Sequence, residues 1–589
     1  PGLTTVYTYD HGHRLLTATA QGAGVDPANP SATSLVLESR SYDPAGRLTR
    51  IVDAGGHETE YDWYADNLLH KVQLEIPGDD LVTEHYDYSN GFLTKFTTAE
   101  NRITTFAYDP AGNVSTQRVD PSGLNRRTDY TYNPDNTVAT ATATGAASPG
   151  RVETVSYTYD AAGRVVSTTV DNTGGSPSSL TTTYERDPRG LIIRTTDPSG
   201  VAVEQTYDAL DRLVTVTEAP RSVWVNGVEQ TGVSPVTTYG YNTFDELTHV
   251  EDPNGNVTLT LYDEMGRPES VALPEYTPPG SSTPIIPVIL TSYNDQGLPE
   301  TVTDPLGNVT SYTYNPYGRV LTRTDPDPDG PGGPKTGPQW SWEYTRTGKV
   351  ARVTDPVAAY TTYSYDQYLD RLVEECVSEG GHAFCYPTTY EYNDAGDVTA
   401  ITTPPTAAAP NGARTEITYN KAGEPTRVTD PTGRVVRVGY DMAGRVVTTA
   451  TGRINGSSVD SDGPVEATTW DLAGRAVAVS VCTPTATGGC GTVLATTTHT
   501  FDGAGRPLSS ITPEGRPTFY TYDTAGQLVG VTQRVDPSDP GTAITVALGY
   551  DAAGNLTRLL DGNGNATIYT YNPWHLPEKT IEPSTSAHP

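Results

Sequence analysis

The chain has 589 residues, a length typical of about four ordinary domains, yet only 35% of its residues are hydrophobic even with 37 tyrosines included. Its 71 Asp and Glu residues outnumber 38 Lys and Arg, giving a net charge of −33, the reverse of the balance that a nucleic-acid binder needs to contact phosphates. No run of 18 apolar residues is present, which excludes a membrane-spanning helix and predicts no membrane insertion. Gly and Pro recur at fixed intervals, which a disordered chain does not require.

One motif recurs along the whole chain: an aromatic residue, Asp or Asn, two variable residues, Gly, and often Arg and an aliphatic residue. Degenerate copies begin at Tyr9, Tyr61, Tyr132, Tyr207, Tyr241 and Tyr571. With these included, about twenty-three units follow one another, and we interpret residues 1–589 as a single continuous repeat segment. The clearest copies contain Tyr42, Asp43, Gly46, Arg47, Tyr108, Gly112, Tyr159, Gly163, Tyr262, Gly266, Tyr314, Gly318, Tyr440, Gly444, Tyr522, Gly526, Tyr550 and Gly554.

A second turn signal lies between successive motifs. Six pairs of motif aromatics, such as Tyr241 and Tyr262, are 21 residues apart, and the second signal falls 11 residues after the first aromatic. It usually reads Asp-Pro-x-Gly or a close variant. These signals begin at Asp252, Asp304, Asp355, Asp430, Thr512 and Asp561.

Both signals have the chemistry of tight turns. In the copy at Tyr42, the Asp43 carboxylate can accept backbone N–H groups two residues on, Pro44 presets φ, and Gly46 takes the left-handed conformation. This pattern predicts a type I turn closed by a glycine bulge, which joins antiparallel strands. Residues that tolerate positive φ replace the missing Gly in three copies: Asn136, Asp211 and Asp245.

The segments between turns are predicted to be strands. Aromatic and hydroxyl residues alternate, as in Tyr157-Thr-Tyr159 and Tyr312-Thr-Tyr314, and a period of two is typical of β-structure. Two strands per unit give roughly 46 strands, or a ribbon about 220 Å wide at 4.8 Å per strand. Rolled once, the ribbon has a diameter of about 70 Å and an opening of about 50 Å, which the available apolar side chains do not fill. We therefore predict an all-β fold, a long meander wound into a spiralling hollow shell, rather than stacked sandwiches.

The repeated Tyr-Asp-x-x-Gly-Arg unit followed by Asp-Pro-x-Gly resembles the YD or RHS repeat of bacterial polymorphic toxins, of the B and C components of insecticidal toxin complexes, and of teneurins. The resemblance extends from Tyr9 to Tyr571. It implies a large spiral β-cage that, in the bacterial relatives, encloses a C-terminal toxin. Those relatives usually end in a self-cleaving, aspartate-protease-like segment and a toxin, whereas here another repeat leads into a polar tail. We therefore expect the chain to be a segment of a longer protein.

Four cysteines form two close pairs in long spacers between motifs: Cys376 with Cys385, and Cys482 with Cys490. We expect each pair to form a disulfide that closes a protruding hairpin, which places the chain in an oxidising compartment. The alternative is reduced cysteines that pack as small apolar residues. Zinc is not expected, because neither pair has a second close pair of ligands.

Asp325, Asp327 and Asp329, followed by Gly330, have the spacing of the first half of a calcium loop. The twelfth position is Thr336 rather than the usual Glu. We therefore favour a solvated acidic hairpin tip over a calcium site, and we expect no other cofactor.

No catalytic motif is present, and the one close His pair, His11 and His13, supplies too few ligands for a metal. The motif arginines are expected to pair with repeat carboxylates across neighbouring strands. The resemblance therefore implies a non-catalytic shell, secreted or at the cell surface, that protects a C-terminal toxin or effector for delivery in interbacterial competition. Its partners are the enclosed polypeptide and flanking shell segments, with no nucleic acid. The alternative is a teneurin-like adhesion scaffold that binds partners or glycans through protruding hairpins.

Overall fold

The computed structural model describes residues 3–74, 82–144, 152–278, 281–330, 335–366, 371–378, 384–455, 458–485 and 489–583. Across these ranges 46 strands form one sheet, two further strands form a separate hairpin, and the only helical element is a short 3-10 turn, η1 (Pro540–Thr542). The prediction of an all-β repeat fold is confirmed. No helix in the described residues is long and apolar enough to cross a membrane.

We call the 46-stranded sheet the wall and its strands the wall strands. The first half of the wall contains 23 strands of five to nine residues. They are β1 (Thr4–Tyr9), β2 (Leu15–Gln21), β3 (Ser34–Tyr42), β4 (Leu48–Asp53), β5 (Glu58–Trp63), β6 (Leu69–Leu74), β7 (Val82–Ser89), β8 (Phe92–Thr97), β9 (Ile103–Tyr108), β10 (Val114–Val119), β11 (Arg126–Tyr132), β12 (Val138–Thr144), β13 (Glu153–Tyr159), β14 (Val165–Asp171), β15 (Ser179–Arg186), β16 (Ile192–Thr196), β17 (Ala202–Tyr207), β18 (Leu213–Thr217), β21 (Val236–Tyr241), β22 (Leu247–Glu251), β23 (Val257–Tyr262), β24 (Pro268–Ala272) and β25 (Val288–Tyr293). The separate hairpin, β19 (Arg221–Val225) and β20 (Val228–Val233), is inserted after β18.

The second half also contains 23 strands, and the longest of them, β38 to β41, lie side by side. They are β26 (Pro299–Thr303), β27 (Val309–Tyr314), β28 (Val320–Thr324), β29 (Gln339–Tyr344), β30 (Val350–Thr354), β31 (Tyr360–Tyr365), β32 (Leu372–Ser378), β33 (Cys385–Tyr392), β34 (Val398–Thr402), β35 (Arg414–Tyr419), β36 (Pro425–Thr429), β37 (Arg434–Tyr440), β38 (Val446–Asn455), β39 (Ser458–Trp470), β40 (Ala476–Pro484), β41 (Cys490–Phe501), β42 (Pro507–Ile511), β43 (Pro517–Tyr522), β44 (Leu528–Arg534), β45 (Ala543–Tyr550), β46 (Leu556–Leu560), β47 (Ala566–Tyr571) and β48 (Pro577–Ile581).

The sheet is an antiparallel meander in which each wall strand pairs with the next wall strand in the sequence, and β18 pairs with β21. Turns therefore alternate between its two edges. The edge after the odd-numbered strands carries the aromatic-Asp-x-x-Gly motifs, such as residues 43–47, and we call it the motif edge. The other edge carries the second turn signals, such as residues 252–256, and we call it the spacer edge.

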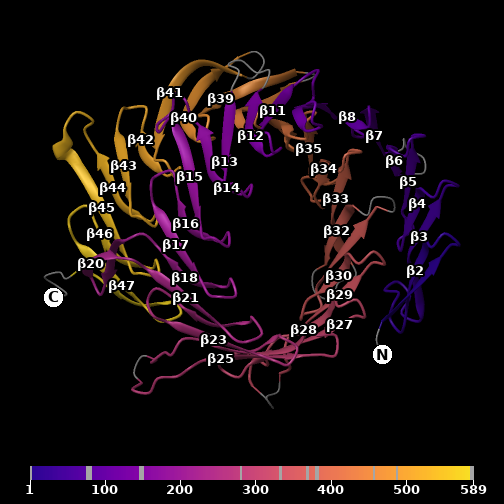
Figure 1. Ribbon diagram of the computed structural model, residues 1–589, viewed down its shortest axis with the longest axis horizontal. Coiled ribbons are helices and arrows are strands. Elements are labelled where there is room, and N and C mark those ends of the chain that lie inside the picture. Colours follow the sequence, from indigo (N-terminus) through magenta and orange to yellow (C-terminus); the bar gives the residue numbers. More distant parts are fainter. Residues whose placement is uncertain are drawn as a thin grey trace.

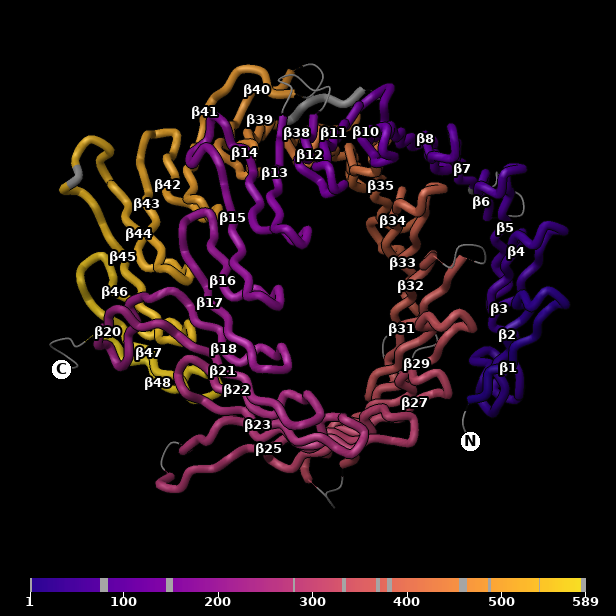
Figure 2. Tube along the Cα trace, in the orientation of Figure 1, coloured from indigo at the N-terminus to yellow at the C-terminus, as the bar shows by residue number. Residues whose placement is uncertain are grey.

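The meander winds as a spiral of about two turns (Figures 1 and 2). Hydrogen bonds join residues 292 to 333 positions apart, for example Tyr317 to Val25 and Thr557 to Trp224. Most of these contacts join two strand-connecting loops that are separated by 23 strands of the 46-stranded sheet. One turn of the spiral therefore holds about half of the 46 strands. At about 4.8 Å per strand its circumference is about 110 Å and its diameter about 35 Å. The diameter of about 70 Å predicted for a single roll was therefore too large by about twofold, because the ribbon winds twice.

The wall is thin and has little buried core. The accessible surface is 32,189 Å², whereas a compact protein of this mass exposes about 20,000 Å². Among the described residues, the two clusters of buried apolar side chains each contain only three members. They are Ala20, Val25 and Leu35, and Ala450, Val465 and Cys482. Turns and cross-strand contacts, rather than a thick core, therefore hold the wall together.

Candidate functional site: the repeat turns and the seam of the spiral

Each complete motif forms a turn in which the Asp carboxylate organises the backbone. In the turn after β13, Asp160 Oδ1 accepts the N–H groups of Ala162 at 2.9 Å and Arg164 at 3.0 Å, and Oδ2 accepts Arg164 Nε at 2.8 Å. Gly163 has φ of 76°, and its N–H donates to the Asp160 carbonyl at 3.0 Å. These bonds, led by the backbone bond from Arg164, lower the pKa of Asp160 below its usual value. The predicted Asx turn with a left-handed Gly is confirmed.

The structure places the predicted motif residues as the pattern requires. The motif tyrosines end odd-numbered strands beside a shift in strand register, as at Tyr42 and Tyr159. The motif glycines all have positive φ: Gly46, Gly112, Gly163, Gly266, Gly318, Gly444, Gly526 and Gly554. The substitutes Asn136, Asp211 and Asp245 also have φ of 65–66°, as predicted.

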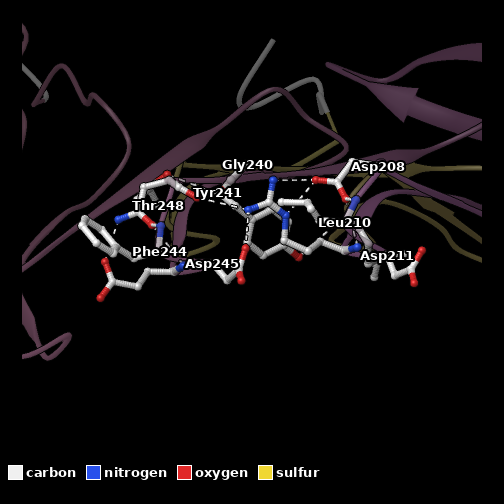
Figure 3. Close-up of polar contacts among 12 residues, drawn as sticks. Asp208, Leu210, Asp211, Gly240, Tyr241, Phe244, Asp245 and Thr248 are labelled. Atoms are coloured by element: carbon white, nitrogen blue, oxygen red, sulfur yellow. Dashed lines mark hydrogen bonds and ion pairs between the residues drawn. The ribbon is translucent and has the colours of Figure 1, made fainter.

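The motif arginine joins one turn to the next along the motif edge. Arg212 pairs with Asp208 of its own turn at 2.6 Å. Its Nη1 then donates to the Asn242 carbonyl at 3.1 Å and to Asp245 at 2.8 Å, and its guanidinium lies 4.9 Å from the centre of the Tyr241 ring (Figure 3). We expected these arginines to pair with carboxylates across neighbouring strands, but their main partner is the Asp of the same turn. Arg47, for example, pairs with Asp43 at 2.7 Å. The partner lies four residues earlier because the turn itself brings the two side chains together.

The motif aromatic residue closes the hairpin that precedes it. Tyr159 Oη donates to the Val138 carbonyl at 2.8 Å, and Trp470 Nε1 donates to the Val446 carbonyl at 2.9 Å. The same bond recurs at most motif tyrosines, to the first residue of the preceding even-numbered strand or, for Tyr108, to its second residue, Leu93. The motif therefore favours an aromatic residue with a hydrogen-bond donor, although Phe501 occupies this position in one copy. Sequence reasoning missed this role, although the predominance of Tyr over Phe was the available signal.

The two turns of the spiral meet along a seam, where the motif edge of the second turn contacts the spacer edge of the first. Tyr317 packs against the cluster around Val25 and donates its hydroxyl to the Val25 carbonyl at 2.7 Å. Arg346 holds both carboxylate oxygens of Asp26 at 2.8–3.1 Å, and the Asp26 side chain is only 5% exposed. The Arg346 bond lowers the pKa of Asp26. This end of the seam combines apolar packing with an ion pair.

Polar contacts continue along the rest of the seam. Arg126 pairs with Glu424 at 2.6 Å and Arg102 pairs with Asp397, so two arginines of the first turn meet carboxylates of the second. Further on, several of the bonds that connect the two spiral turns are between neutral groups. These neutral bonds join Ala473 to Asn172, Ala504 to Ser199, Thr524 to Pro220, and Trp574 to Pro274.

The inserted hairpin β19–β20 crosses the seam, and we call it the clasp hairpin. Arg221 is buried there, donates to the Ala552 carbonyl at 2.8 Å, and lies 3.8 Å from Asp523. The Trp224 carbonyl accepts from Thr557 at 2.7 Å. Sequence reasoning did not identify the clasp hairpin, because its partners are more than 300 positions away.

A pocket of about 830 Å³ opens at the seam beside β39 and β41. Trp470 and Phe501 supply its aromatic surface, and residues 173–176 of the first turn form its far side. Its Asp471 and Arg475 are paired with each other at 2.7 Å. Among the described residues, no group of three or more His, Cys, Asp or Glu side chains is placed to hold a metal.

Both predicted disulfides are present. Cys376 joins Cys385 at the end of β32 and β33, and Cys482 joins Cys490 at the end of β40 and β41. Both bonds lie on the spacer edge of the second turn, and parts of the two hairpin tips, residues 379–383 and 486–488, lie outside the described residues. Each disulfide thus links its two strands covalently near the tip end of the described hairpin.

The acidic loop after β28 does not gather its three carboxylates. Asp325 pairs with Arg323 at 2.8 Å, and the Asp327 carboxylate accepts the N–H of Asp329 at 3.3 Å. Burial, and next a hydrogen bond with Asp327, raise the pKa of Asp329. Residues 331–334 of this loop lie outside the described ranges. The preference for a solvated acidic hairpin tip over a calcium site stays a prediction.

The RHS repeat family model matches residues 86–125, 186–219, 293–329, 419–454, 496–538 and 550–587. No curated protein matches the sequence. The crystal structure of TcdB2-TccC3-Cdc42 is 12% identical over 97% of this chain and 40% of its own, with a TM-score of 0.56. That of TcdB2-TccC3 is 13% identical over 97% of this chain and 35% of its own, with a TM-score of 0.53. This chain thus spans two fifths or less of their length, and the likeness shows a shared fold.

Proposed function

Because this chain is an RHS-repeat protein, we propose that it forms the wall of a hollow shell that encloses a polypeptide and keeps it from contacting its targets. In this proposal the chain has no catalytic role, and the enclosed polypeptide is a C-terminal toxin or effector delivered in interbacterial competition. The observation that carries the proposal is the two-turn spiral, whose thin wall surrounds a central opening (Figures 1 and 2).

The surface chemistry of the wall supports the proposal. One face of several hairpins carries hydroxyl residues that bond across the strands, such as Thr158 with Ser167 at 2.6 Å and Thr313 with Thr322 at 2.7 Å. The chain also carries a net charge of −33. A polar, acidic wall has few large apolar patches on which an unfolded polypeptide adheres. Such a wall suits containment rather than tight binding.

The similarity to known structures and the disulfides support two further parts of the proposal. TcdB2-TccC3 has the same fold and, by its name, combines two components, which fits a shell whose partners are an enclosed chain and other shell segments. The two disulfides fit an oxidising environment, and we place the protein outside the cell or on its surface.

A protection assay tests containment. An unstructured polypeptide with one site for a sequence-specific protease is fused after Pro589, and its cleavage rate is compared with that of the same polypeptide free in solution. We expect cleavage to be at least tenfold slower in the fusion. The matched control is the same fusion with Arg126→Ser and Arg346→Ser, which removes ion pairs of the seam and should restore part of the cleavage. Equal rates for the free and fused polypeptides would contradict the proposal.

Intact-mass measurement and terminal peptide mapping of the protein from its natural source test the identity of the cargo. A compact domain after residue 589 that is released by an internal cut is the expected result. An anchoring or lectin-like module without a separable C-terminal piece would instead favour the adhesion scaffold.

A further inference from the structure

Two motifs of the second spiral turn carry an acid at the sixth position, where the repeat usually has arginine. In the turn after β35, Asn420 Nδ2 donates to Glu424 Oε2 at 2.7 Å. The same Glu424 oxygen accepts Arg126 Nη2 of the first spiral turn at 2.6 Å. In the turn after β33, Asp397 holds the sixth position and pairs with Arg102 of the first spiral turn. An acidic motif therefore receives its cation across the seam rather than from its own turn.

The next hairpin along the seam has the opposite polarity. Arg445 holds the sixth position after β37 and pairs with Asp441 of its own turn at 2.6 Å. Its Nη1 also lies 4.0 Å from Glu153 Oε2 of the first spiral turn. Glu153 and Arg126 are equivalent residues, since each is the first residue of its strand, β13 or β11. The facing residue is thus acidic where the motif is basic, and basic where the motif is acidic.

We propose that these paired charges, which we call the seam charge code, select the facing loop and thereby fix the number of strands in one turn of the spiral. Each of the three pairs joins loops that are 23 wall strands apart. If one turn held one hairpin more, Arg126 would face Arg445. If it held one hairpin fewer, Glu153 would face Glu424. Of these three registers, only the observed one places opposite charges at all three loops.

The charges of the code are partly shielded from water, so their signs affect the energy of the seam. The Arg126 and Glu424 side chains are each 17% exposed, as is Arg445. Solvent and salt screen such partly buried charges less than exposed ones. Complementary charges in a contact fix its register, and like charges placed together suppress wrong partners. The code concerns the winding of the ribbon and does not depend on what the shell encloses.

Reversal of one charge in the full chain tests the code. Glu424→Arg gives this motif the residue that most copies have, yet it places two arginines together across the seam. Hydrogen exchange is measured at two N–H groups that cross the seam on either side of the altered pair. Asp394 donates to Glu100 at 3.1 Å, and Ala473 donates to Asn172 at 3.3 Å. We expect both groups to exchange about tenfold faster in the variant.

Reversal of the facing charge should restore the seam. The double variant Arg126→Glu, Glu424→Arg has the polarity of the natural pair in the next hairpin, and we expect its exchange rates to lie within about threefold of those of the unchanged chain. Arg102→Glu combined with Glu424→Arg should not restore them, because Arg102 belongs to the neighbouring loop. This comparison separates selection of one loop from a general effect of charge.

Arg127→Glu is the matched control, because Arg127 pairs with Asp129 of its own strand at 2.7 Å and does not cross the seam. Unchanged exchange in Glu424→Arg, the same acceleration in the control, no recovery in the double variant, or recovery with Arg102→Glu would each overturn the proposal. Circular dichroism melts verify that the variants fold. A chain that shows the expected loss and recovery but does not slow cleavage of the fused polypeptide would contradict the shell function alone.

Discussion

Removal of the Arg346 side chain should open the seam locally. Arg346→Ala deletes a bidentate ion pair and leaves the Asp26 carboxylate, 5% exposed, without its cation. Charge-assisted hydrogen bonds contribute about 1.5–3 kcal/mol each in buried sites, but Arg346 is 46% exposed, so solvent screens much of this energy. We therefore expect the free energy of local opening at this part of the seam to fall by about 1–2 kcal/mol.

Hydrogen exchange measures this opening directly. The N–H groups of Ala28 and Asn29 bond to Asp26 in the loop that Arg346 contacts, and a loss of 1–2 kcal/mol corresponds to exchange about 5- to 30-fold faster. Arg323→Ala is the matched control, because Arg323 pairs with Asp325 two residues away and does not cross the seam. Unchanged exchange in the loop, or the same acceleration in the control, would refute the view that this ion pair holds the spiral turns together.

Three further outcomes are expected. Tyr159→Phe removes the bond to the Val138 carbonyl and should lower the stability of its hairpin by about 1 kcal/mol, measured by hydrogen exchange across β12–β14. Gly163→Ala should cost about 1 kcal/mol by the same measurement, because φ is 76° although the space around the new methyl group is open. The pKa values of the turn aspartates are lowered in the folded state, so the stability that they contribute is complete above about pH 4 and is lost as pH falls through the folded pKa values. Thermal melts between pH 2 and 7 should therefore show a melting midpoint that falls below about pH 4. A melting midpoint that does not change with pH would contradict this.

The repeat unit was predictable from the amino-acid sequence because every contact that builds it is local. The turn of Asp160 and Gly163 uses bonds over two to four residues, and each strand pairs with its neighbour in the chain. The disulfides were predictable for the same reason, since they join residues eight or nine positions apart. The replacement of the motif Gly by Asn136 was also predictable, because it depends only on the tolerance of Asn for positive φ.

The winding of the ribbon could not be predicted in the same way. The number of strands per spiral turn depends on small twist and coiling angles that add up over about 23 strands, and no local pattern encodes their sum. The pairing of Asp26 with Arg346 and the burial of Arg221 of the clasp hairpin both depend on that sum. Residues about 300 positions apart become neighbours only when the spiral completes its first turn, and this packing sets the diameter of the spiral.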